Sequence, residues 1–175
     1  MPGTINELNP VSRIRAAAIG QPGKRVFYLQ ASGDDELVTL IVEKAQLQSL
    51  ALAVEQLLAE LQERFPELSE VSPALDQREM ELELPIDPLF RVGEIGLGYD
   101  RELDQFVLET RELVTESTDP AEASVARFWC TRSQLHALAR WGLELAGRGR
   151  KLCGNCGEPI DPEGHFCPKR NGHKH

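Results

Sequence analysis

Two stretches of the chain repeat one short pattern, and this echo constrains the fold more than any other feature. Residues 44–51 read KAQLQSLA and residues 132–139 read RSQLHALA. Each copy directly follows an apolar run with strand character, at residues 40–42 and 128–130. Two copies of one supersecondary unit indicate an internal repeat. The sequence therefore predicts a pseudo-twofold repeat of a unit made of a strand pair and a helix.

Each copy of the pattern opens a stretch with the periodicity of an amphipathic helix. In the first stretch, apolar residues between positions 47 and 61 recur at intervals of three and four, and a proline at position 66 ends the helix. The second helix is expected over residues 132–146. Its apolar stripe includes Gly142, which would let this helix approach the sheet closely.

The residues in front of the two helices are suited to cap them. Thr131 with Gln134 fits a capping box, in which the hydroxyl binds a first-turn N–H group and the amide reaches back to the cap residue. Glu43 holds the same position before the first helix and offers a carboxylate to its free N–H groups. The similar capping chemistry supports an interpretation with two related units.

Strand patterns, separated by turns rich in glycine, proline and aspartate, account for most of the remaining chain. Strands are expected at residues 13–19, 25–31, 37–42, 79–84, 90–99, 106–109 and 125–130. Neighbouring strands joined by short turns pair as antiparallel meanders. The predicted class is therefore α+β, with a mostly antiparallel sheet on one side and two helices on the other.

Composition excludes several classes of protein. The 175 residues carry 28 acidic and 19 basic side chains, a net charge of −9, which opposes non-specific binding to nucleic acid. No apolar run approaches the roughly 20 residues that a membrane-spanning helix needs. The first residues lack the basic and apolar regions of a secretory signal. We therefore expect a cytoplasmic protein without a membrane segment.

The last 28 residues form a distinct tail. Residues 148–175 contain three of the four cysteines and three of the four histidines. Cys153 and Cys156 have the spacing of a zinc knuckle, and Cys167 supplies a third thiolate. We predict an α+β domain at residues 1–147 and a small zinc-ribbon-like tail at residues 148–175.

The fourth ligand has two main candidates. His165 lies two residues before Cys167, and His173 lies six residues after it. Four protein ligands close the coordination of Zn²⁺, so we interpret the ion as structural rather than catalytic. A redox pair formed by Cys153 and Cys156 is the alternative, although no helix follows the motif as thioredoxin-like chemistry requires.

Two candidates outside the tail have simpler interpretations. Cys130 alternates with Trp129 on a strand and is expected to be a small buried residue. His136 lies on the predicted helix away from its apolar stripe and is expected at the surface. Neither residue has a partner in the sequence that would indicate nucleophilic catalysis.

Several segments together resemble an uncharacterised bacterial family, best represented in actinobacteria and Chloroflexi and described as a domain of unknown function. The matching segments are residues 20–31, 90–100, 153–157, 164–168 and 171–172. The resemblance implies a cytoplasmic protein with a C-terminal zinc-ribbon-like tail. It implies no activity and no catalytic residue.

The distribution of charge suggests a binding function. Residues 1–147 carry 13 basic and 25 acidic side chains, net −12, whereas residues 148–175 carry six and three, net +3. The leading hypothesis is a non-enzymatic binding or adaptor protein with a protein partner. One alternative is an enzyme that acts on a phosphorylated or nucleotide-like small molecule in a cleft between the two halves. A second alternative is nucleic-acid binding through the basic tail.

Overall fold

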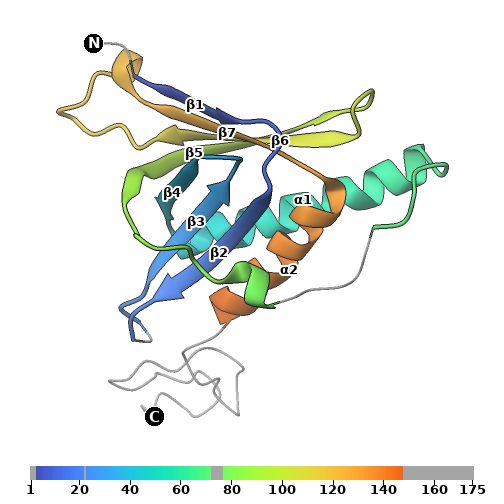
Figure 1. Cartoon of the computed structure of the whole chain (residues 1–175), viewed down its shortest axis with the longest axis horizontal. Coiled ribbons are helices and arrows are strands. Elements are labelled where there is room, and N and C mark those ends of the chain that lie inside the picture. The colour runs from blue at the N-terminus through green and yellow to red at the C-terminus, as the bar shows by residue number, and fades with distance from the viewer. Residues whose placement is uncertain (1–2, 22, 72–76, 148–175) are drawn as a thin grey trace, which may run out of the picture.

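Seven strands and two α-helices form the part of the chain that the computed structural model describes, residues 3–21, 23–71 and 77–147 (Figure 1). The strands are β1 (Ile5–Leu8), β2 (Arg13–Ile19), β3 (Val26–Ser32), β4 (Leu37–Val42), β5 (Pro88–Asp100), β6 (Gln105–Glu112) and β7 (Val125–Cys130). The α-helices are α1 (Lys44–Arg64) and α2 (Arg132–Gly147), and two short 3-10 helices are η1 (Gln77–Met80) and η2 (Pro120–Glu122). The predicted α+β class is confirmed.

The strands form one mixed sheet whose two edge strands, β1 and β2, are consecutive in the chain. The order is β1-β7-β6-β5-β4-β3-β2, with antiparallel meanders β2-β3-β4 and β5-β6-β7. β4 pairs with β5 in parallel, and β1 pairs with β7 in parallel. The edge strands β1 and β2 are joined by residues 9–12, where Val11 N–H donates to Trp129 O at 2.9 Å. Ser12 N–H donates to Ser32 O at 2.7 Å, so this linker bonds first to β7 and then to β3. β1, β7 and β6 cross above β2–β4 in Figure 1.

The two meanders and their helices form a repeat. Unit 1 comprises β2, β3, β4 and α1, and unit 2 comprises β5, β6, β7 and α2. The repeated unit thus has three strands rather than the predicted pair. β4 begins at residue 37 and β7 at residue 125, and each ends one residue before the residue that precedes its helix, so corresponding positions lie 88 residues apart.

Two glutamines at corresponding positions tie the units together. Gln46 and Gln134 each accept, through Oε1, the backbone N–H of the residue before their helix, at 2.8 and 2.9 Å. Gln134 N–H donates to Thr131 Oγ1 at 3.1 Å, which confirms the predicted capping box. Gln46 Nε2 donates to Val92 O in unit 2, and Gln134 Nε2 donates to Val11 O just before unit 1. Gln46 therefore anchors the cap of α1 to the first strand of unit 2, and Gln134 anchors the cap of α2 to the linker that leads into unit 1.

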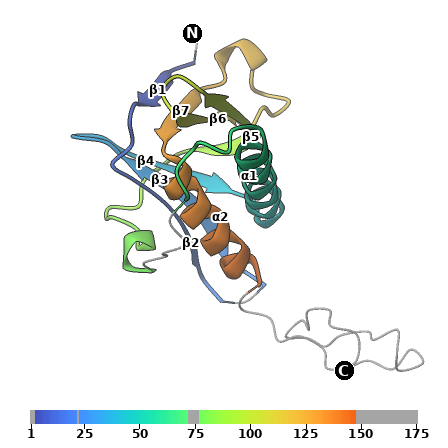
Figure 2. The same ribbon diagram turned by 90° about the vertical axis from the view of Figure 1, so that its right-hand side faces the viewer.

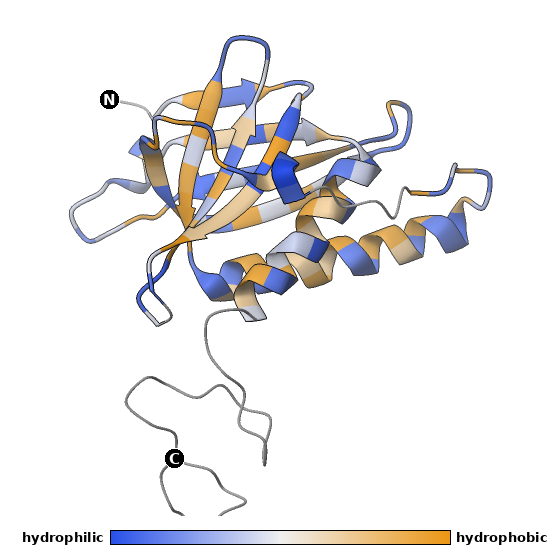
Figure 3. Cartoon of the chain, turned by 60° about the horizontal axis from the view of Figure 1, so that its bottom comes forward, coloured by the Kyte–Doolittle hydropathy of each residue, from blue (hydrophilic) through white to orange (hydrophobic). Residues whose placement is uncertain are grey.

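Both helices lie on one face of the sheet and pack against each other (Figures 2 and 3). One continuous core joins buried residues of both helices to buried residues of the strands. A Cβ atom added at Gly142 would lie 3.2 Å from Leu47 Cδ1 on α1. Gly142 therefore lets α2 approach α1, and the expectation that it serves contact with the sheet is wrong.

Residues 79–84 do not form the predicted strand. They belong to a segment, residues 77–87, that crosses the opposite face of β2–β4 and that we call the strap. Its apolar alternation misled the prediction, because Met80 is buried but Leu84 is 79% exposed. No strand was predicted at β1, whose four residues pair with β7, some 120 residues away.

The contact at Gly142 predicts a stability effect. Gly142→Val should destabilise the domain by about 1–3 kcal/mol, because added methyl groups in a packed interior displace Leu47. Gly96→Val is the control, since a Cβ atom there meets nothing within 4 Å. Urea denaturation followed by circular dichroism measures both. Equal stability of the two variants would contradict the described helix contact.

Candidate functional site

The predicted zinc ligands Cys153, Cys156, His165, Cys167 and His173 lie outside the described residues, and the zinc site stays a prediction. Among residues 3–21, 23–71 and 77–147, no group of three or more His, Cys, Asp and Glu side chains could hold a metal ion. No helix of that part of the chain is long and apolar enough to cross a membrane.

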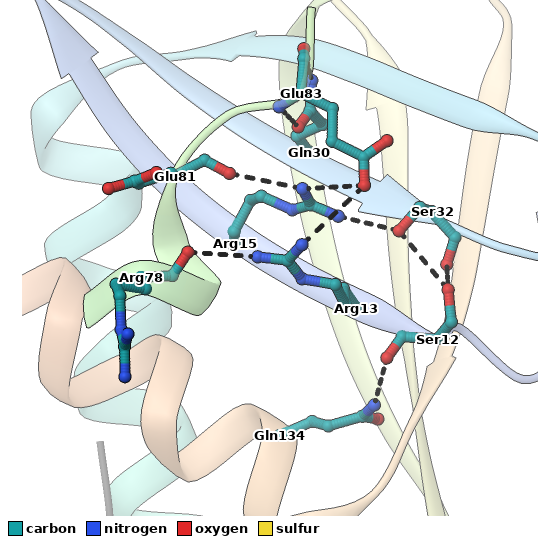
Figure 4. Close-up of polar contacts among 9 residues, drawn as sticks. All are labelled: Ser12, Arg13, Arg15, Gln30, Ser32, Arg78, Glu81, Glu83 and Gln134. Carbon is teal, nitrogen blue, oxygen red and sulfur yellow. Dashed lines mark hydrogen bonds and ion pairs between the residues drawn. The ribbon is translucent and has the colours of Figure 1, made fainter. Parts of the chain in front are cut away.

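A buried polar row crosses the sheet face opposite the helices (Figure 4). Arg15 on β2 is 0% exposed and is the largest fully buried side chain among the described residues. The strand register places Arg15 opposite Gln30 on β3, and Gln30 opposite Thr39 on β4. Both Gln30 and Thr39 are also buried. Three strands thus present a hydrogen-bonding surface to the strap.

The strap is held through its main chain. Gln30 accepts from Glu83 N–H at 2.8 Å and donates to Glu83 O at 3.1 Å, as a neighbouring strand would. Arg15 Nη1 donates to Glu81 O at 3.3 Å, and Arg13 Nη2 donates to Arg78 O at 3.2 Å. Side chains of the sheet therefore replace the ladder that a strand at residues 79–84 would have made.

The carboxylate of Glu83 lies close to the guanidinium groups of Arg15 and Arg13, and we call these three residues the arginine cluster. Glu83 Oε1 lies 3.2 Å from Arg15 Nη1 and 3.9 Å from Arg13 Nη1. Burial lowers the pKa of Arg15, the charge of Arg13 lowers it further, and Glu83 opposes both effects. Desolvating a guanidinium costs several kcal/mol, so Arg15 depends on its partners. The cluster fastens the strap to β2 and β3.

A second charged group lies at the start of α2. Arg132 Nε and Nη2 donate to the two carboxylate oxygens of Asp104 at 2.8 and 3.0 Å. Tyr99 OH donates to Asp104 Oδ1 at 2.6 Å. The hydrogen bond from Arg132 lowers the pKa of Asp104, while burial and the bond to Asp104 raise the pKa of Tyr99 to about 12. The positive charge of Arg132 is therefore neutralised by the carboxylate of Asp104.

Cys130 and His136 have structural roles. Cys130 is fully buried, as predicted, and burial raises the pKa of its thiol to about 12. His136 was predicted at the surface, but its side chain is only 20% exposed, and its Nδ1 is 2.9 Å from Glu55 Oε1 on α1. The histidine and the glutamate join the two helices.

Two hollows flank the start of α1. The first, which we call the seam hollow, has a volume of about 230 Å³ where unit 1 meets β5, and its lining includes Arg25, Lys44 and Arg91. The second, which we call the groove, has a volume of about 440 Å³ and lies between α1 and β5. Its walls include Ala45, Ser49, Ala53, Ile95 and Leu97. A cleft between the two halves was expected, and each hollow is lined by residues of unit 1 and of β5. The sequence did not identify the lining residues, because they come from elements far apart along the chain.

The fold and these sites define a pseudo-symmetric α+β domain with a strap over one sheet face and two hollows beside one helix. The chain belongs to the family described as "Protein of unknown function (DUF3090)", whose model matches residues 6–167. No curated protein and no solved structure matches the chain.

The arginine cluster predicts a specific loss of stability. Glu83→Gln should cost about 1–3 kcal/mol, because Arg15 stays charged and buried without its carboxylate. Glu81→Gln is the matched control, since the carbonyl of Glu81, not its carboxylate, accepts from Arg15. Urea denaturation should place Glu81→Gln within about 0.5 kcal/mol of the natural chain. Equal losses would contradict the role of Glu83.

Proposed function

We propose that the protein is a cytoplasmic binding module that docks a protein partner through the groove between α1 and β5. The observation that carries this proposal is an internal comparison. Unit 2 fills the corresponding space with its own tryptophan, whereas unit 1 leaves it open.

The filled space lies between α2 and β2. Trp141 is 7% exposed, and its Nε1 donates to Ala16 O at 2.9 Å. The position 88 residues earlier on α1 is Ala53, which lines the groove. Where α2 carries the indole ring of Trp141, α1 therefore carries only the methyl group of Ala53.

The walls of the groove fit an aromatic side chain. Ala45, Ser49 and Ala53 follow one another at intervals of four along α1 and form a row of small side chains. Gln46 and Leu50 line the groove beside this row. Ile95 and Leu97 form the opposite wall and are half-buried. Tryptophan and tyrosine bury large areas and dominate protein interfaces. The partner therefore inserts an aromatic residue where unit 2 holds Trp141.

Filling the groove should abolish this binding. Ala53→Trp copies the residue of unit 2, and the folded domain should keep its stability while losing the site. The probe is indole, titrated into the natural chain and followed by amide chemical shifts. We expect saturable shifts at residues of the groove, including Ser49 and Gly93, and their loss in Ala53→Trp.

The control is Leu52→Trp, which adds an indole at a neighbouring position that is 62% exposed. This variant should bind indole as the natural chain does. The proposal fails if indole produces no saturable shifts, or if Ala53→Trp leaves them unchanged.

The tail is proposed to hold a structural Zn²⁺ through Cys153, Cys156, Cys167 and one histidine. The family match extends to residue 167 and therefore includes His165 but not His173, which favours His165. A basic tail of net +3 beside a domain of net −12 favours docking on an acidic surface. The acidic domain opposes the alternative of nucleic-acid binding.

Metal analysis tests the zinc proposal. The purified chain should contain about one Zn²⁺, and Cys156→Ser should lose it, because structural zinc requires all four ligands. His165→Ala should lower zinc content while His173→Ala should not. Zinc near zero in protein prepared with added zinc would contradict the site, and the reverse histidine result would exchange the fourth ligand.

A further inference from the structure

We infer that the groove selects a tryptophan side chain of the partner, whose indole N–H group donates a hydrogen bond to the carbonyl oxygen of Leu97. The inference rests on the proposed function, because it names the residue that the groove receives and the contact that recognises it. The other helix shows such a contact within the chain. α2 packs on β2, and Trp141 Nε1 on α2 donates to Ala16 O on β2 at 2.9 Å.

The glutamines of the two helix caps align the strands beside the helices. Gln134 Nε2 on α2 donates to the carbonyl oxygens of residues 11 and 12, both at 3.4 Å. Gln46 Nε2 on α1 donates to those of residues 92 and 93, at 3.0 and 3.4 Å. The corresponding carbonyl groups thus lie 81 positions apart in the chain. The same offset makes Leu97 on β5 the counterpart of Ala16 on β2.

Strand register gives the same offset independently. Val42 and Cys130 end the strands that lead into the helices, and they pair with Phe27 and Phe106. These two phenylalanines pair in turn with residue 18 on β2 and residue 99 on β5. The partners on β2 and β5 are again 81 positions apart, so the two strands hold the same place in their units.

The helix residues align in the same way. Trp141 lies seven residues after Gln134, and Ala53 lies seven residues after Gln46. Both positions are therefore equally far along their helices from the glutamine that bonds to the strand. The indole of Trp141 supplies a donor to the carbonyl of Ala16, whereas the methyl group of Ala53 offers none to the carbonyl of Leu97.

The edge of β5 beside the groove is not covered by a described strand. β4 pairs with β5 at Pro88, Phe90 and Arg91, and no strand of the described residues pairs with residues 93–99 on that side. Leu97 is half-buried and lines the groove, whereas Ala16 is 0% exposed under α2. The volume of about 440 Å³ beside Leu97 is thus open where the counterpart is filled.

The carbonyl oxygen gives the groove a preference among aromatic residues. A docked ring removes water from this oxygen, and a buried acceptor without a donor is unfavourable. The indole ring carries one N–H donor on its edge, which replaces the lost water. Phenylalanine has no donor, and the hydroxyl group of tyrosine lies at the tip of its ring. Tryptophan is therefore the residue whose donor lies where Trp141 already places it.

Titration of the full chain with three indoles, followed by amide chemical shifts, tests the inference. 3-Methylindole is the side chain of tryptophan and keeps the N–H group, whereas its isomer 1-methylindole has the same size but no donor. We expect 3-methylindole to bind at least as tightly as indole. 1-Methylindole should bind about tenfold more weakly, as the loss of one hydrogen bond to a buried acceptor implies.

The carbonyl carbon of Leu97 reports the hydrogen bond directly. Its chemical shift should move on saturation with indole or 3-methylindole, and it should not move with 1-methylindole at equal occupancy. The carbonyl carbon of Ala16 is the matched control, because Trp141 already donates to its oxygen, and its shift should stay constant with all three compounds.

The outcomes separate this inference from the proposed function. If 1-methylindole binds as tightly as 3-methylindole, or if saturation with indole leaves the carbonyl shift of Leu97 unchanged, the inference is overturned while the groove remains a binding site. If none of the three indoles binds saturably, both the inference and the proposed function are overturned.

Discussion

Two parallel strand pairings hold the fold together. The pairing of β4 with β5 joins unit 1 to unit 2, and the pairing of β1 with β7 joins unit 2 to the segment that leads into unit 1. The thirteen residues of β5 pair first with β4 of unit 1 and then with β6 of unit 2. The segment from β1 to β2 does the same in reverse, pairing first with β7 and then with β3. Neither unit can close its sheet without the other. The seam hollow, the groove and the helix caps all lie along these junctions.

Features set by neighbouring residues could be predicted from the sequence. The bounds of β2, β4 and β7, the course of both helices and the capping box at Thr131 follow from alternation, helical period and local hydrogen bonding. Features set by distant residues could not. The strap has the alternating sequence of a strand, but its main chain is hydrogen-bonded to the side chains of Gln30 and Arg15. β1 is a strand because its four residues pair with β7, which is distant in the sequence.

The candidate sites depend on differences between two similar units. The echo at residues 44–51 and 132–139 showed the similarity, and extending it by two positions would have paired Ala53 with Trp141. The zinc ligands are the opposite case, since their spacing alone suggests the site.

The meeting of β1 with β7 also bears on how the chain is made. A ribosome completes β2, β3, β4 and α1 long before it reaches residues 125–130, so β1 waits for its partner through most of synthesis. Pairings of such large sequence separation slow folding. Until β7 arrives, an unpaired edge is exposed to other chains, and chaperones have their longest opportunity to act on this protein.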